Sequence, residues 1–178
     1  MNPDLRIATI GRILGLIDQK QTQYGDEGTI DVCDYTDPAI LRSDLDSIFR
    51  GYAVVAAHAS ELAEPCSNIT VDIGEVPVLV NRDRDGVIHA FVNICRHQGA
   101  RLVTNCKGTA KAFKCPYHAW TYLDQGDLTQ VPRQEAFPSL DRSACGLVKL
   151  TVQEAGGFAW VTNRAGSRTC RRWSDGTD

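Results

Sequence analysis

Two cysteine–histidine pairs are the residues of this chain with the clearest capacity for chemistry. Cys95 and His97 form a C-x-H motif, Cys115 and His118 form a C-x2-H motif, and seventeen residues lie between His97 and Cys115. A mixed-ligand 2Fe–2S cluster uses two cysteines on one iron and two histidines on the other. The two motifs therefore predict such a cluster, held at the tips of two adjacent loops.

The residue types and their neighbours suit this chemistry. Two neutral imidazoles in place of two thiolates remove two negative charges from the surroundings of the cluster, so the reduction potential rises. Gly99 and Pro116 suit tight loops, because glycine permits unusual backbone angles and proline stiffens a turn. The free ring N–H groups of the histidines can face solvent or a partner, which couples the redox state to protonation.

Zinc is the main alternative for these four side chains, because a Cys2His2 set also satisfies a tetrahedral zinc ion. The C-x-H spacing of the first motif differs from the spacing of ordinary zinc fingers, and the flanking residues favour iron and sulfur. We expect Cys95, His97, Cys115 and His118 to bind the cofactor, and we assign no residue a catalytic role.

The composition indicates an ordinary globular domain. The chain has 178 residues, of which 43% are hydrophobic and 23% are charged, enough to build a core without disulfides. A net charge of −3 and the lack of a long basic run give no support to nucleic-acid binding, and the mild acidity would suit a basic partner. No apolar run approaches the roughly 20 residues that span a bilayer, so we expect no membrane segment.

The remaining cysteines indicate the compartment. The chain has seven cysteines, and those outside the two motifs show no paired spacing. Asp4, Arg6 and Arg12 near the N-terminus disfavour a cleaved secretion signal. We therefore predict free thiols and a cytoplasmic protein.

Two helices and then short strands are predicted along the chain. Apolar residues at positions 10, 13, 14 and 17 predict an amphipathic helix, and Asp37 and Pro38 begin a second helix that Gly51 ends. From Tyr52 onward, short apolar or alternating runs are separated by turn signals. We expect a mainly β fold of small antiparallel sheets with one or two N-terminal helices.

This pattern divides the chain into three parts. Residues 1–51 are predicted to be a helical region and residues 52–162 the β domain with the two cluster-binding loops. Residues 163–178 are rich in Arg, Ser, Gly and Thr, can bury little, and are predicted to be a disordered tail.

The segments NICRHQGARL (Asn93–Leu102) and FKCPYHAWTY (Phe113–Tyr122) resemble the Rieske domain of aromatic-ring-hydroxylating oxygenase α subunits. The resemblance covers about residues 35–162. It implies a Rieske-type fold with one 2Fe–2S cluster, in which Cys95 and Cys115 ligate one iron and His97 and His118 the other. Two departures are mild and touch no ligand. They are Gln98, where an arginine is common, and Ala119, where a glycine is common.

The same segments distinguish between kinds of Rieske protein. The high-potential respiratory proteins carry an extra cysteine in each loop, and this chain has Ala100 and Tyr117 at those positions. They also carry a hydroxyl donor just after the second histidine, where this chain has Ala119 and Trp120. Fewer hydrogen bonds to the cluster predict a potential at the lower end of the Rieske range. Trp120 is expected to pack beneath its loop.

The histidines limit what the chain is predicted to do. In the family that it resembles, a larger catalytic domain with a mononuclear iron follows the Rieske domain. No histidine follows His118, and His58 and His89 are interpreted as ordinary core or surface residues. We therefore expect no mononuclear iron in this chain, which we interpret as a truncated product.

The predicted function is electron transfer. Electrons would pass from a reductase or ferredoxin to a mononuclear iron on another chain, such as an oxygenase catalytic chain, and an oligomer is possible. The alternatives are a stand-alone Rieske ferredoxin and a non-catalytic iron–sulfur or zinc module for redox sensing or binding. Whether the chain is an enzyme on its own stays open.

Overall fold

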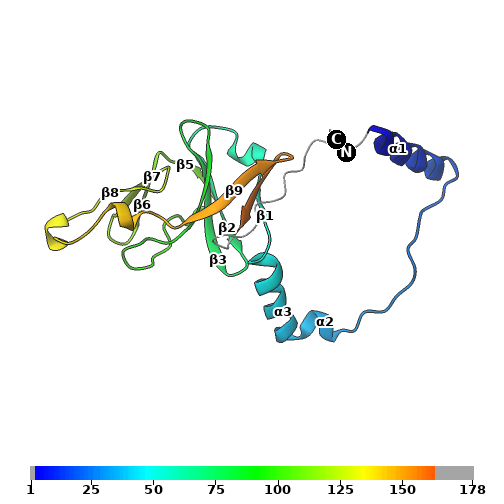
Figure 1. Ribbon diagram of the computed structural model, residues 1–178, viewed down its shortest axis with the longest axis horizontal. Helices are drawn as coiled ribbons and strands as arrows, with labels where there is room; N and C mark the ends of the chain where they lie inside the picture. Colours follow the sequence, from blue (N-terminus) through cyan, green and yellow to red (C-terminus); the bar gives the residue numbers. More distant parts are fainter. Residues whose placement is uncertain (1–2, 163–178) are drawn as a thin grey trace. The chain divides into compact units, whose positions relative to one another are not determined.

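The computed structural model describes residues 3–162, which fall into two compact units, residues 3–41 and 42–162 (Figure 1). The first unit contains α1 (Pro3–Asp18), which includes the predicted apolar stripe and buries none of its residues, and α2 (Cys33–Thr36). Within residues 3–162, no helix combines the length and the hydropathy needed to cross a bilayer. The tail predicted at residues 163–178 lies outside the described residues, and the predicted domain boundaries stay a prediction.

The second predicted helix begins where the sequence indicates. It is formed by α3 (Pro38–Asp44), which continues as the π-helical turn η1 (Leu45–Phe49). The Asp37 carboxylate accepts a hydrogen bond of 2.7 Å from the Ala39 N–H, as expected of a capping residue. At Gly51, a Cβ atom would lie 2.1 Å from the Ser47 carbonyl oxygen, so the chain can leave the helix this closely only with glycine.

Seven antiparallel strands form the larger sheet, in the order β1-β10-β9-β4-β3-β2-β5. Among the turn signals of the sequence, residues 83–86 and 156–157 join β3 to β4 and β9 to β10. The strands are β1 (Val54–His58), β2 (Ser67–Ile73), β3 (Val76–Arg82), β4 (Ile88–Val92), β5 (Lys107–Thr109), β9 (Lys149–Ala155) and β10 (Phe158–Thr162).

A second sheet of three strands carries one of the two predicted loops. It consists of β6 (Ala112–Lys114), β7 (Thr121–Leu123) and β8 (Leu128–Gln130), in chain order. Single turns of 3-10 helix complete the description: η2 (Ala59–Leu62), η3 (Gln134–Ala136) and η4 (Ser143–Cys145). The mainly β fold class is therefore confirmed. The strands β5 and β8 were not predicted, because Lys-Gly-Thr at β5 has no apolar residue and Leu-Thr-Gln at β8 has only one.

The hydrophobic core lies on both faces of the larger sheet. Successive residues of β3 point to opposite faces, so Val78 and Val80 pack in one cluster of buried side chains and Leu79 in another. The cluster with Leu79 contains residues of both sheets, and the two motif cysteines, Cys95 and Cys115, are buried in it. The predicted cofactor site is therefore built into the packing between the sheets.

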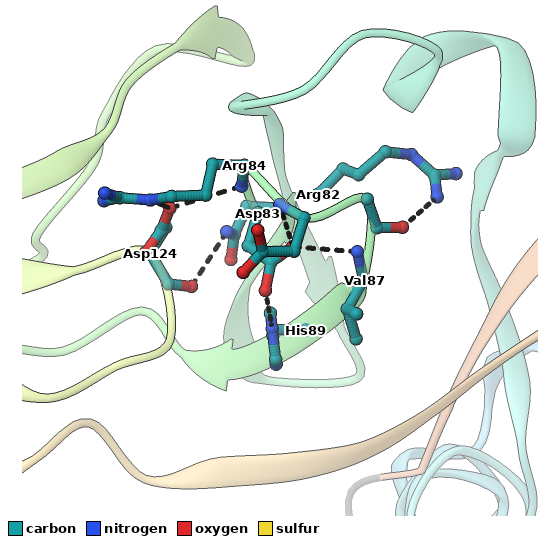
Figure 2. Close-up of polar contacts among 9 residues, drawn as sticks. Arg82, Asp83, Arg84, Val87, His89 and Asp124 are labelled. Carbon is teal, nitrogen blue, oxygen red and sulfur yellow. Dashed lines mark hydrogen bonds and ion pairs between the residues drawn. The ribbon is translucent and has the colours of Figure 1, made fainter.

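A buried carboxylate organises the turn between β3 and β4. Asp83 is buried and accepts hydrogen bonds from the backbone N–H groups of Val87, at 2.8 Å, and Asp85, at 3.0 Å (Figure 2). Its other oxygen lies 2.8 Å from Nε2 of His89. Burial opposes the ionisation of Asp83, but these hydrogen bonds outweigh burial and lower its pKa. The interpretation of His89 as a structural histidine is thereby confirmed.

A second buried carboxylate joins the two sheets. Asp124 follows β7 and accepts a hydrogen bond of 3.2 Å from the guanidinium of Arg84, which lies in the turn after β3 (Figure 2). The backbone carbonyl of Asp124 accepts a second bond, of 2.9 Å, from the buried side-chain amide of Asn81. These contacts fix the hairpin of the smaller sheet against the larger one.

Candidate iron–sulfur site

The first loop is closed by a compact turn that begins at its cysteine. The N–H of Cys95 donates to the carbonyl of Ala100 at 2.8 Å, and the N–H of Gly99 donates to the carbonyl of Cys95 at 3.0 Å. Gly99 has a φ of +73°, in the left-handed region that glycine adopts without strain. His97 lies within this turn, two residues after the cysteine.

The second loop repeats the same turn. The N–H of Cys115 donates to the carbonyl of Trp120 at 2.8 Å, and the N–H of Ala119 donates to the carbonyl of Cys115 at 3.0 Å. Ala119 occupies the position of Gly99 with a φ of +59°, which is strained for a residue with a Cβ. His118 lies three residues after its cysteine, whereas His97 lies two residues after its own. The two histidines therefore occupy successive positions of the same type of turn.

The two turns bring their side chains together in two pairs. Cys95 and Cys115 are close enough for their thiols to interact electrostatically, and the imidazole rings of His97 and His118 meet edge to face with their centroids 4.8 Å apart. Burial raises the pKa of the Cys95 thiol, and the neighbouring Cys115 adds to the effect. In residues 3–162, no three His, Cys, Asp or Glu side chains are close enough together to hold one metal ion. Two separate pairs match the ligand requirement of a two-iron cluster.

The ring of His97 is held by aromatic neighbours. The buried Trp120 stacks on it at 4.7 Å with an interplanar angle of 8°, and Phe137 meets it edge-on at 5.6 Å. The prediction that Trp120 packs beneath its loop is confirmed. The Nδ1 atom of His97 is buried and has no hydrogen-bond partner among the residues described. An orphaned ring nitrogen beside a buried thiol pair fits a metal cofactor.

The ring of His118 has different surroundings. His118 is exposed, and besides its edge-to-face contact with His97 its ring lies against the ring of Tyr117, at a centroid distance of 3.8 Å. Tyr117 is itself 64% exposed. The two predicted histidine ligands are therefore unequal: one lies inside an aromatic cage and the other at the surface.

One hydrogen bond to the site was not predicted. The hydroxyl of Tyr122, which is fully buried, lies 3.3 Å from Sγ of Cys95 and accepts a bond of 3.0 Å from the N–H of Arg96. Burial and the Cys95 contact raise the pKa of the Tyr122 phenol, so its proton stays in place for donation. Tyr122 stands on β7, four residues after His118 and beyond the Ala119 and Trp120 positions, at which the sequence lacks a hydroxyl donor.

Asn93 is a second residue that the motifs do not identify. Its buried side-chain amide donates to the carbonyl of Val103 at 2.7 Å and accepts from the Val103 N–H at 2.9 Å. This pair of bonds imitates one step of a β-ladder and closes the first loop at its base. The side chain that does so stands two residues before Cys95.

The remaining predicted residues have structural roles. His58 accepts a hydrogen bond from the Ser60 N–H at 3.2 Å and caps η2, as its interpretation as an ordinary histidine implies. Free thiols were predicted for the cysteines outside the two motifs, and the four of these within residues 3–162 form no disulfide: Cys33, Cys66, Cys106 and Cys145. The fifth, Cys170, lies outside the described residues.

The fold and the site define an iron–sulfur protein, and the model of the Rieske [2Fe-2S] domain family matches residues 52–142. The chain belongs to this family, whose cofactor is one 2Fe–2S cluster and whose function is electron transfer.

The relatives are subunits of oxygenases. The chain is 36% identical over 129 residues to the large subunit of anthranilate 1,2-dioxygenase from Acinetobacter baylyi, and 38% identical over 128 residues to the oxygenase subunit of glycine betaine monooxygenase from Chromohalobacter salexigens. These matches cover 72% of the chain but only 27% and 28% of the two relatives. The chain resembles the N-terminal part of such subunits, which favours this interpretation over a stand-alone ferredoxin or a sensing module.

A solved structure shows the same fold. A quaternary ammonium Rieske monooxygenase, described in terms of carnitine oxidation and inter-subunit electron transfer, aligns with a TM-score of 0.74 and 31% sequence identity. The alignment covers 80% of this chain and 39% of that protein. The recognition of a Rieske oxygenase domain from two short segments is thereby confirmed.

Proposed function

We propose that Cys95 and Cys115 hold one iron of the cluster and that His97 and His118 hold the other. The observation that carries this proposal is the buried Nδ1 atom of His97, which has no partner among residues 3–162. A buried polar atom left unpaired costs about 1–3 kcal/mol, and a metal ion bound there would remove that cost. The adjoining thiols supply the anionic ligands that iron requires.

The chain is proposed to relay single electrons between other redox proteins. The cluster, when bound, supplies a site that takes up and releases one electron. Trp120 and Phe137 shield His97, whereas His118 is exposed, so the His118 edge is the surface that a redox partner can approach. The partners that the relatives support are a reductase or ferredoxin as donor and the mononuclear iron of an oxygenase on another chain as acceptor.

Spectroscopy of the purified protein tests the proposal. We expect a red-brown protein with about two iron and two sulfide per chain and a Rieske-type EPR signal after reduction. Cys115→Ser should abolish the signal, and Cys106→Ser, a change at an exposed cysteine of the same region, should leave it intact. A colourless protein that contains zinc, or equal loss in both variants, would contradict the proposal.

A further inference from the structure

The charge around the two loops is opposite in sign to the charge of the whole chain. The net charge of the chain is −3, but residues 94–133 contain six lysines and arginines against two aspartates. One of these two is Asp124, which is buried and paired with Arg84. All six cations are exposed: Arg96, Arg101, Lys107, Lys111, Lys114 and Arg133.

Most of these cations lack a carboxylate neighbour. Arg101 pairs with Asp72 at 2.9 Å, and Lys107 approaches Glu61 at 3.5 Å. In the part of the chain that the structure describes, the other four form no ion pair. They are Arg96, Lys111, Lys114 and Arg133. A solvent-exposed cation that forms no ion pair within its own chain is available to a carboxylate of another protein.

Two of the unpaired cations adjoin the proposed ligands. Arg96 stands between Cys95 and His97, and Lys114 directly precedes Cys115. The two turns are in contact, because the N–H of Arg96 donates to the hydroxyl of Tyr122 on β7, and β7 pairs with β6 at Lys114. Arg96 and Lys114 therefore lie beside the same site.

The exposed edge of the site also offers an aromatic contact. The ring of Tyr117 is 64% exposed and stacks on the exposed imidazole of His118. An aromatic side chain surrounded by charged residues is the usual arrangement of a protein–protein interface, in which aromatic contacts supply affinity and rim charges supply orientation and association rate.

We propose that this face, with Tyr117 and His118 at its centre and Arg96 and Lys114 beside them, docks an acidic electron-transfer protein. The inference rests on the proposed function and adds the chemical class of the partner. One electron would pass from the reduced partner, which is oxidised, to the oxidised cluster, which is reduced. Cationic side chains attract an acidic partner over about 8–10 Å at moderate ionic strength, so binding depends on salt.

Binding of an oxidised plant-type [2Fe–2S] ferredoxin, a strongly acidic protein, tests the proposal. Its dissociation constant for the cluster-loaded chain should rise at least about tenfold between about 0.02 M and about 0.3 M salt. Arg96→Glu/Lys114→Glu should weaken low-salt binding about tenfold or more and remove most of the salt dependence. The matched control, Arg6→Glu/Arg12→Glu in α1, makes the same charge change and should bind like the unaltered chain.

A second measurement separates docking from the cluster itself. Each variant is reduced with dithionite and its EPR signal recorded, because loss of that signal would be a failure of the cluster rather than of docking. If the double variant loses its signal, Lys114→Glu alone, in a position exposed on a strand, provides the same comparison. Variants with an intact signal that bind the ferredoxin as the unaltered chain does, or binding that is independent of salt, would overturn the proposal.

An acidic segment of the chain itself provides the competing occupant. Residues 24–37 contain five carboxylates and no lysine or arginine. If Asp31→Asn/Asp34→Asn strengthens ferredoxin binding, the acidic segment competes with the ferredoxin for this face. That result would overturn the proposal that the face binds a separate acidic protein. Unchanged binding in this variant, with weakened binding in Arg96→Glu/Lys114→Glu, supports it.

Discussion

Replacing Tyr122 with phenylalanine should lower the reduction potential of the cluster. The Tyr122 hydroxyl lies 3.3 Å from Sγ of Cys95, the proposed iron ligand. A donor to a ligand sulfur stabilises the reduced state more than the oxidised state, because the added electron places more negative charge on the ligands. Removal of the hydroxyl therefore makes the cluster harder to reduce.

The size of the shift follows from the strength of this one bond. Hydrogen bonds to charged groups contribute about 1.5–3 kcal/mol and neutral ones about 1 kcal/mol, so a difference of about 1 kcal/mol between the two redox states is reasonable. For a one-electron couple, about 59 mV corresponds to a factor of ten, and the expected shift is about −40 mV. The Arg96 N–H also loses its acceptor, so a modest loss of stability should accompany the shift.

A redox titration followed by EPR measures the midpoint in both proteins. Tyr117→Phe is the matched control, because the Tyr117 hydroxyl forms no hydrogen bond within residues 3–162; the midpoint of this variant should stay near that of the unaltered chain. An unchanged or higher midpoint in Tyr122→Phe, with the cluster intact, would refute the role assigned to this hydroxyl.

Three further predictions concern ligation, acid stability and backbone strain. His97→Cys should keep a cluster but lower its potential and change its EPR spectrum, because the new ligand is anionic; an unchanged spectrum would contradict the ligand assignment. The pKa of Asp83 is lower in the folded state than in the unfolded state. Ionised Asp83 therefore stabilises the fold at pH values above its unfolded pKa of about 3.9, and this stabilisation is lost as the pH falls through the lowered pKa of the folded state. Asp83→Asn should therefore cost about 1–3 kcal/mol in urea unfolding at neutral pH, and the difference should shrink in acid, whereas a constant difference would contradict this account. Residues 99 and 119 hold the same left-handed position of the two turns, so Ala119→Gly should stabilise the chain by about 1 kcal/mol and Gly99→Ala should destabilise it by a similar amount. Thermal unfolding measures both changes. Shifts of the same sign in the two variants would contradict the equivalence of the turns.

The sequence predicted the two loops well because their chemistry is local. Cys95 and Cys115 are each followed within three residues by a histidine, and this spacing together with the flanking residues indicates the cofactor. The strands were also predictable wherever turn residues separate alternating runs, as at Gly156 and Gly157. The confirmed helix start at Asp37 has the same local basis, an oxygen that accepts a backbone N–H two residues on.

What the sequence could not supply depends on contacts between distant segments. Tyr122 and Cys95 lie 27 residues apart, so their hydrogen bond is visible only after β6 and β7 pair beside the first loop. The difference between a caged His97 and an exposed His118 depends on Phe137, which no motif connects to the site. The charge of the loop region was concealed by the opposite charge of the whole chain.

The repeated turn also has a consequence for how the protein persists in a cell. The first loop follows a strand of the seven-stranded sheet, and the second joins two strands of the three-stranded sheet. A cofactor held by both would be a cross-link between the sheets, and its binding energy would add directly to the free energy of folding. Iron starvation would then remove the cross-link along with the electron carrier, and the cofactor-free chain would be the better substrate for proteases.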